Sequence, residues 1–279
     1  MTTVLLVLAA LGLDRFLPEP RRYHPLALFG HGAEALEGRL NRGPVRRLRG
    51  GLALVLLVAP PALLAAGLGS LPGIGPFIAL GLLFLALGGG SLAAHAEAVA
   101  APLSRGDLPS AREAVGRLVS RETAAMEEPE IAGATVESVL ENGADAVFGA
   151  LFWFVVLGPG GVVAYRLVNT LDAMWGYRSE RFTAFGWAAA RADDLLNGIP
   201  ARLTAGTYAL VGAWEPAMAC WRGQAAGWKS PNAGPVMAAG AGALGVQLGG
   251  AATYDGLSEE RPVLGRGERP EAADIRRAV

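Results

Sequence analysis

The chain is poor in charge, in cysteine and in lysine. Of its 279 residues only 18% are charged, while 52% are hydrophobic and the mean hydropathy is +0.35. This composition differs from that of ordinary soluble domains and favours a membrane protein. The formal net charge of −1 provides no basic field that would attract nucleic acid. Cys220 is the sole cysteine, which excludes an intrachain disulfide and any multi-cysteine metal site.

The sequence has a single lysine and lacks three common catalytic motifs. Lys229 is the one lysine among 24 basic residues, a bias that coding composition explains as readily as the geometry of the arginine side chain. No Walker A motif, GxSxG elbow or HExxH occurs, so any ATP site is of an unusual kind. GAGALG at 240–245 matches the dinucleotide fingerprint literally, but no strand precedes it, and small residues are typical of closely packed membrane helices.

Long apolar segments alternate with polar ones. Residues 51–70 and 72–94 carry no charge, and each approaches the roughly 20 residues that a span needs, so they predict a transmembrane hairpin. No stretch alternates between apolar and polar residues for long enough to predict a β-sheet. We therefore expect an all-α, polytopic integral membrane protein that forms a single membrane-embedded domain, 1–279. The apolar segments lie near 2–13, 51–70, 72–94, 146–165, 203–220 and 233–250, and the polar ones are 14–50, 95–145, 166–204 and the tail 251–279.

The first apolar run, 4–13, is too short to span a bilayer without its flanks. The run is either a signal peptide or a helix that the mature protein retains. We favour the retained helix, because no basic residue precedes the run and no small-x-small cleavage site follows it before Asp14 and Arg15. The arginine-rich connector 14–50 then faces the cytoplasm by the positive-inside rule.

The apolar segment 146–165 is interrupted by the sequence GPGG at 158–161. A simple span would export the arginine-rich segment 166–204, against the positive-inside rule. The alternative is a segment that breaks at GPGG and enters and leaves on the same face, because irregular backbone is tolerated at membrane depth where protein buries it.

Three carboxylates share one face of a predicted helix. TVESVLENGADAV places Glu137, Glu141 and Asp145 at i, i+4 and i+8, with Asn142 beside them. Like charges at this spacing repel, so the pattern indicates a Mg²⁺ ion or arginines from elsewhere. A solvated acidic face is the alternative.

A second polar set follows within 168–204. Its charged and amide residues recur three apart, so each pair can share a helical face. Arginine suits phosphate, and carboxylate and amide oxygens suit hard cations, which together indicate a site for a phosphorylated substrate and magnesium. An ion-pair network at the membrane interface is the alternative. Further along, SPNAG at 230–234 predicts a turn in which Ser230 and Asn232 are the hydrogen-bonding side chains.

Several of these motifs together resemble one family. They are SRET at 120–123, ATVESVLENGADAV, the block YRLVNTLDAMWGYRSERFTAFGWAAARADDLLNGIPARLTA, SPNAG and AGALGVQLGG. In this order they resemble the cobinamide-phosphate synthase family, the CbiB-type membrane proteins of cobalamin biosynthesis, and DRFLPEPRRYHP resembles that family's N-terminal segment. The resemblance runs from about residue 14 to 265, although the apolar stretches match only in character.

The resemblance implies an enzyme that joins adenosylcobyric acid to aminopropanol, or its O-phosphate, through an amide bond. ATP would be the co-substrate and Mg²⁺ the cofactor. The expected partners are the corrinoid substrate, aminopropanol phosphate and membrane lipid, with no nucleic acid; further copies of the chain or other corrinoid-pathway enzymes are additional candidates. Because ATP is cytoplasmic, we expect a cell-membrane protein whose active site faces the cytoplasm.

The same resemblance implies roles for individual residues. The candidate catalytic residues are Glu137, Glu141, Asp145 and Asp172. The candidate metal ligands are Glu141, Asp145, Asp172, Asp193 and Asp194. The candidate substrate- or phosphate-binding residues are Arg121, Asn142, Asn169, Tyr177, Arg178, Arg181, Arg191, Asn197, Ser230 and Asn232.

The chain also departs from the family pattern. Glu122 stands where Asp is usual, Gly143 and Ala144 replace residues that are usually Ser or Thr, Ala173 replaces a serine, and Pro235-Val236 replaces Trp-Pro. These changes keep the charged set and allow a variant amine specificity. A membrane sensor or transporter related to the family is the alternative function. A transporter places charges within its spans at broken helices, whereas here the charges lie mainly between the apolar segments, which favours an enzyme.

Overall fold

The protein is built almost entirely of helices. The computed structural model describes residues 2–17, 24–177, 179–254 and 256–279. Its strands within this part are two short antiparallel pairs: β1 (Gln247–Leu248) with β4 (Leu264–Gly265), and β2 (Ala252–Tyr254) with β3 (Leu257–Glu259). The prediction of an all-α fold is therefore confirmed.

The chain forms two compact units. The first contains the residues up to Gly90 and Asp145–Asn197, and the second contains Ser91–Ala144 and Gly198–Val279. That the whole chain acts as one membrane-embedded domain stays a prediction.

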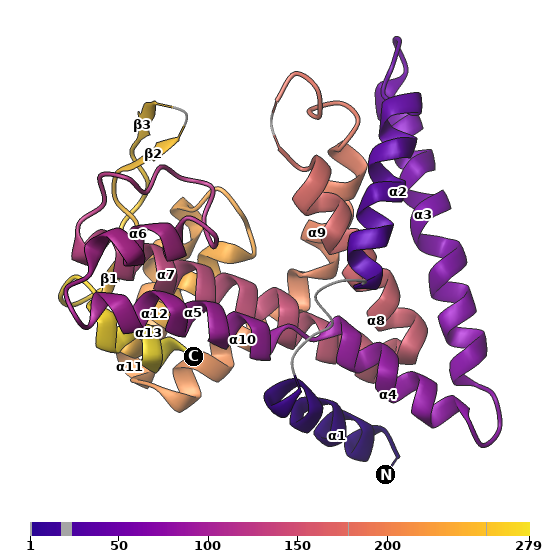
Figure 1. Ribbon diagram of the computed structural model, residues 1–279, viewed down its shortest axis with the longest axis horizontal. Helices are drawn as coiled ribbons and strands as arrows, with labels where there is room; N and C mark the ends of the chain where they lie inside the picture. Colours follow the sequence, from indigo (N-terminus) through magenta and orange to yellow (C-terminus); the bar gives the residue numbers. More distant parts are fainter. Residues whose placement is uncertain (1, 18–23, 178, 255) are drawn as a thin grey trace. The chain divides into compact units, whose positions relative to one another are not determined.

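Helices of the first unit surround two apolar clusters. One cluster gathers around Leu83, Phe154 and Tyr165, and the other around Trp175 and Phe185. The helices, labelled in Figure 1, are α1 (Thr2–Phe16), α2 (Pro25–Leu40), α3 (Arg46–Gly69), α4 (Gly75–Ala86), α8 (Ala150–Trp175) and α9 (Trp187–Leu196).

Three helical stretches in the described part are long and apolar enough to cross a membrane. They are α3, the 29-residue stretch Gly75–Leu103 that joins α4 to α5 (Gly89–Leu103), and the 48-residue stretch Glu128–Trp175. Only 11% of the most apolar 18-residue segment of α3 is buried inside the protein. Leucines such as Leu56 and Leu63 are therefore exposed. An exposed face of this kind suits lipid, which indicates a membrane protein.

The longest of these stretches does not run straight. Gly158 has φ 65° and ψ −153°, and Pro159 follows it. The Tyr165 hydroxyl lies 2.9 Å from the carbonyl oxygen of Asp145, although 20 residues of continuous helix would span about 30 Å. The chain therefore reverses at Gly158, and the helical segments on its two sides lie against each other. The predicted break at GPGG is confirmed; entry and exit at one membrane face stays a prediction.

A glycine allows this close approach. A Cβ at Gly149 would lie 2.1 Å from the Tyr165 hydroxyl oxygen, so no larger residue fits there without moving the tyrosine. Gly149 ends a π-helical turn, η1 (Ala144–Gly149), and such turns are frequent at functional sites.

The second unit is organised around α12 (Ala233–Leu244), of which residues 233–242 are all buried. Small residues bring its neighbours close: a Cβ at Gly240 would meet Leu140 at 2.7 Å, and one at Gly242 would meet the carbonyl oxygen of Pro216 at 2.7 Å. GAGALG thus serves helix packing, as predicted. The other helices are α6 (Leu108–Val115), α7 (Glu128–Gly143), α10 (Gly198–Val211), α11 (Trp214–Gln224), the 3-10 turn η2 (Ala225–Gly227) and α13 (Ala272–Ala278).

The Gly158 reversal predicts a stability effect that depends on backbone conformation alone. A Cβ at this position would meet nothing within 4 Å, so Gly158→Ala is strained only by its φ, at a cost of about 1–3 kcal/mol. Gly81→Ala in α4, which also meets nothing within 4 Å, is the matched control and should unfold at or slightly above the wild-type temperature. Thermal unfolding in detergent measures both; equal midpoints for the two variants would contradict the strained reversal.

Candidate functional site

The predicted site residues fall into two groups, one in each unit. Arg178 lies outside the described residues. The first unit holds Asp145, Asn169, Asp172, Tyr177, Arg181, Arg191, Asp193, Asp194 and Asn197. The second holds Arg121, Glu137, Glu141, Asn142, Ser230 and Asn232.

Four residues of the first unit form what we call the Asp–Asn cluster: Asp145, Asn169, Asp193 and Asn197. The Nδ2 atom of Asn169 donates to Asp145 Oδ2 at 3.3 Å and to Asp193 Oδ1 at 3.2 Å. Asn197 Nδ2 donates to the other oxygen of Asp193 at 3.0 Å. The Tyr165 hydroxyl lies 2.8 Å from Asn197 Oδ1. The reversal at Gly158 thus brings α8 against η1 and α9 and assembles the cluster.

The Asp–Asn cluster carries negative charge in a partly dehydrated place. Burial raises the pKa of Asp193 above its usual value, the hydrogen bonds from Asn169 and Asn197 oppose this shift, and the charge of Asp194 adds to it. Asp172 lies close enough to feel the charges of both Asp193 and Asp194. A buried carboxylate whose pKa is raised lacks sufficient compensation, and a cation would supply it.

The donor set suits a hard cation only in part. Among the described residues, no group of three or more His, Cys, Asp or Glu side chains could hold a metal ion, so the five predicted ligands do not form a ready-made ligand sphere. Mg²⁺ commonly uses one or two carboxylates together with waters and substrate phosphates. Asp145 and Asp193, which share the amide of Asn169, fit that mode. The magnesium assignment stays a prediction.

Arg181, predicted to bind phosphate, is held in an ion pair on α2. Its Nε and Nη2 atoms donate to the two oxygens of Glu37 at 3.0 and 2.6 Å, and Asn41 donates to the same carboxylate at 2.6 Å. The hydrogen bond from Arg181 keeps the pKa of Glu37 below its usual value of 4.5. Arg181 therefore anchors the segment after α8. Tyr177 is exposed, and Arg191 pairs with Asp194 at 3.3 Å.

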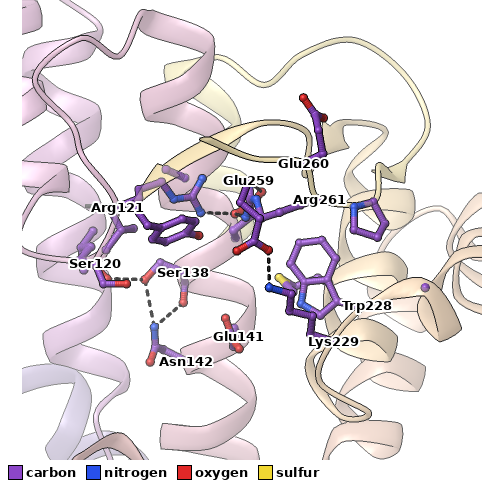
Figure 2. A pocket seen from close by; sticks show the side chains of 18 residues that line it. Ser120, Arg121, Ser138, Glu141, Asn142, Trp228, Lys229, Glu259, Glu260 and Arg261 are labelled. Carbon is purple, nitrogen blue, oxygen red and sulfur yellow. Dashed lines mark hydrogen bonds and ion pairs between the residues drawn. The ribbon is translucent and has the colours of Figure 1, made fainter. Parts of the chain in front are cut away.

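The second unit contains a pocket of about 640 Å³ (Figure 2). Its walls come from α7, from residues 118–121, from residues 227–229, from Met237 of α12, and from Tyr254 and residues 259–262. Four predicted residues line it: Arg121, Glu137, Glu141 and Asn142. The polar and aromatic lining residues that the sequence did not single out as site residues are Ser120, Ser138, Trp228, Lys229, Tyr254, Glu259, Glu260 and Arg261.

Glu137, predicted to be catalytic, is the buried centre of an ion cluster. Its carboxylate accepts hydrogen bonds from Arg121, from Arg261 Nη1 at 2.8 Å and from the backbone N–H of Gly249 at 2.8 Å. The side chains of Glu137, Arg121 and Arg261 are 6%, 11% and 9% exposed. A carboxylate so occupied is suited to positioning the chain, because it ties residues 121, 249 and 261 to α7.

Glu141 and Asn142 remain exposed at the pocket, and Asn142 donates to the backbone oxygen of Ser138 at 2.8 Å. Ser230 and Asn232 do not line it. The Ser230 hydroxyl accepts from the N–H groups of Asn232 and Ala233 at 3.3 and 3.2 Å, and Arg202 donates to Asn232 Oδ1. The predicted turn is confirmed, and through these contacts both side chains stabilise it.

The β2–β3 hairpin forms part of the pocket wall through Tyr254 and Glu259. Glu122, one of the departures from the family pattern, ties the hairpin down: its N–H donates to Thr253 at 2.9 Å, and its Oε1 accepts from Gly256 at 2.6 Å. Arg261 could not have been found from local pattern, since its partner Glu137 lies 124 residues away. For Lys229, being the sole lysine was the one signal present.

Fold and sites together define a helical membrane protein with a carboxylate–amide cluster in one unit and a pocket of mixed charge in the other. The chain belongs to the CobD/Cbib protein family, whose model matches residues 7–279. The predicted family resemblance is therefore confirmed.

Three curated relatives that cover nearly the whole chain carry the name Cobalamin biosynthesis protein CobD. The one from Stutzerimonas stutzeri (strain A1501) is 58% identical over 281 residues, which is 100% of this chain and 93% of the relative. The one from Chromobacterium violaceum is 56% identical over 286 residues, 100% of this chain and 92% of the relative. The one from Mycobacterium tuberculosis (strain ATCC 25618 / H37Rv) is 43% identical over 274 residues, 96% and 87%. No solved structure matches the chain.

The ion cluster around Glu137 predicts that loss of a buried arginine destabilises the protein more than loss of an exposed one. Arg261→Met leaves a buried carboxylate with less compensation and should cost about 3–5 kcal/mol of unfolding free energy. Arg276→Met, which removes a comparable arginine from an exposed pair with Glu97, should cost much less. Unfolding midpoints in detergent compare the two; similar losses would argue against a buried anchor.

The Glu37–Arg181 pair predicts a pH-dependent contribution. Because the folded-state pKa of Glu37 is lowered, its stabilisation is complete above the usual value of 4.5 and is lost as the pH falls through the lowered pKa. Glu37→Gln should therefore unfold at a lower temperature than wild type at about pH 7, with the difference shrinking below about pH 4. Melting curves across this range test it, and a difference that grows on acidification would refute the sign.

Proposed function

We propose that the protein is an adenosylcobinamide-phosphate synthase of cobalamin biosynthesis. It would join adenosylcobyric acid to aminopropanol, or to aminopropanol O-phosphate, through an amide bond with the use of ATP and Mg²⁺. Family membership and the names of the relatives support the pathway. The observation that carries the chemistry is the Asp–Asn cluster, in which Asp145 and Asp193 share the amide of Asn169 and burial raises the pKa of Asp193.

Amide formation needs the substrate carboxylate to become electrophilic. We propose transfer of the terminal phosphoryl group of ATP to that carboxylate, which releases ADP and gives an acyl phosphate. The amine then attacks the acyl carbon, and inorganic phosphate leaves. Phosphoryl transfer depends mainly on positioning and on neutralising charge, and Mg²⁺ would supply that neutralisation when bound.

The chain's own residues have separate tasks in this scheme. Asp145 and Asp193 would hold the cation, with Asn169 and Asn197 fixing the orientation of their carboxylates through the hydrogen bonds already described. Asp172 adds negative charge next to Asp193. Glu141, exposed at the second unit's pocket, would take the proton that the amine must lose to become a nucleophile.

The location of the cluster on the hairpin favours an enzyme over a transporter. A transporter is expected to place charged groups at the break of a discontinuous helix. Here the break at Gly158 is flanked by Leu157 and Pro159, and the polar contacts join Asp145 to Asn169 at the open end of the hairpin. Charges at mid-bilayer cost roughly 2.5–3.5 kcal/mol each. We therefore propose that the cluster lies at the membrane surface, on the cytoplasmic side where ATP is available.

The function is tested by amide formation. Purified wild type in detergent, given ATP, Mg²⁺, adenosylcobyric acid and either aminopropanol or its O-phosphate, should form the amide, followed by mass spectrometry. Asp172→Asn should reduce the rate by at least about a hundredfold. Asp107→Asn, at the N-cap of α6 where Asn serves as well as Asp, should retain the wild-type rate. A folded wild type that forms no product with either amine would refute the synthase and favour the sensor or transporter.

A readout without turnover tests the metal assignment. Mg²⁺ with ATP should raise the unfolding temperature of wild type, since a ligand that binds the folded state stabilises it. Asp193→Asn should lose most of this increase, whereas Asp107→Asn should keep it. An unchanged Mg²⁺ effect in Asp193→Asn would place the cation elsewhere.

A further inference from the structure

The two arginines of the second unit's pocket are committed to Glu137. Both guanidinium groups are nearly buried, and both donate to the same carboxylate. If either left it to meet a ligand, a buried charge would lose compensation, which is costly. Arg121 and Arg261 therefore form the wall of the pocket and hold its shape.

Lys229 differs from them in exposure and in partner. Its side chain is 74% exposed, and its Nζ atom lies 2.5 Å from Glu259 Oε1, whose side chain is 39% exposed. Exposed ion pairs contribute little net stability, so this pair can separate at small cost. A lysine also carries its charge on a flexible stem with three donors, and can follow an incoming anion. Figure 2 shows the pair at the pocket, which Trp228 and Glu141 also line.

The charges around the pocket indicate what kind of ligand it takes. Among the described lining residues, three are cationic and four are carboxylates, the latter including Glu141, Glu259 and Glu260. A polyanionic nucleotide would meet net negative charge there. A small zwitterion with one ammonium and one phosphate matches better, because Glu141 suits the ammonium and Lys229 the phosphate. The cavity of about 640 Å³ is ample for a molecule of that size.

We propose that this pocket is the amine subsite and that Lys229 recognises the phosphate of aminopropanol O-phosphate by exchanging Glu259 for it. The inference rests on the proposed function and assigns one residue of this chain, Lys229, to the recognition of the phosphate group. Glu259 holds the ammonium group of Lys229 at the pocket when the subsite is empty and competes with the phosphate. Lys229 is thus a specificity-determining residue. Competition from Glu259 lowers its affinity for the phosphate.

Kinetics with two amines test the assignment. The ratio of kcat/KM for aminopropanol O-phosphate to that for aminopropanol should fall about tenfold to a hundredfold in Lys229→Met, mainly through KM. Lys229→Arg should restore most of the ratio, and Glu259→Gln should lower KM for the phosphorylated amine. Arg117→Met, which removes an exposed cation paired with Glu113 outside the pocket, is the matched control and should keep the wild-type ratio. Equal ratios in wild type and Lys229→Met would overturn the inference.

The single lysine permits a binding test that needs no turnover. Protein grown with ¹³Cε-lysine gives one lysine side-chain resonance, because Lys229 is the only one in the sequence. Its chemical shift should move, saturably, with aminopropanol O-phosphate and much less with aminopropanol. A shift produced by ATP instead would assign the phosphate to the nucleotide and overturn the inference, as would no shift with any of the three.

The two tests separate this inference from the proposed function. If wild type forms the amide but Lys229→Met keeps the wild-type amine preference, the synthase stands and the subsite assignment fails. If no amide forms with either amine, the synthase fails, while the resonance of Lys229 still reports whether the pocket binds the amino phosphate. Thermal unfolding of each variant confirms that it is folded before either result is interpreted.

Discussion

Residue 158 must adopt a backbone conformation that is essentially restricted to glycine, and the first unit depends on it. Without the reversal there, the hydroxyl of Tyr165 would lie far from Asp145, and Asn169 could not reach across to the same carboxylate. The reversal also lets Phe154 and Val162, on opposite sides of it, contribute to one apolar cluster. A single permissive dihedral angle therefore links the packing of a membrane hairpin to the position of the polar groups that we propose for catalysis.

The two units treat buried carboxylates in opposite ways. Glu137 is surrounded by two guanidinium groups and a backbone N–H, so its charge is compensated within the protein. Asp193 receives only amide hydrogen bonds and has a second carboxylate nearby, which leaves its pKa raised. The compensated carboxylate of Glu137 holds the pocket wall of the second unit in place, whereas the carboxylate of Asp193 would still gain from binding a cation. This contrast is the physical reason to look for the metal in the first unit and for the amine in the second.

Much of the fold could be read from local sequence because its signals are local. Charge-free apolar runs predict α3 and α4, and GPGG predicts the break in α8. The row of carboxylates at i, i+4 and i+8 is divided in the structure, because the π-helical turn η1 begins between Glu141 and Asp145. Glu137 and Glu141 line the pocket of the second unit, and Asp145 belongs to the Asp–Asn cluster of the first. A shared role for the three stays a prediction.

The partners of the predicted site residues come from distant parts of the chain and leave no local trace. Arg181 is paired with Glu37, 144 residues away, and Glu137 with Arg261, 124 residues away. Charge type and spacing predicted that these residues matter. Only their three-dimensional neighbours separate a structural ion pair from a group that remains open to a ligand.

The contact between Tyr165 and Gly149 has a consequence for the environment that the protein needs. It joins the two arms of an apolar hairpin directly beside the Asp–Asn cluster, so the spacing of the polar groups follows the spacing of the arms. Arms of this kind adjust to the thickness of the surrounding hydrocarbon by tilting. We therefore expect the acyl-chain length of the lipid or detergent to affect the geometry of the cluster.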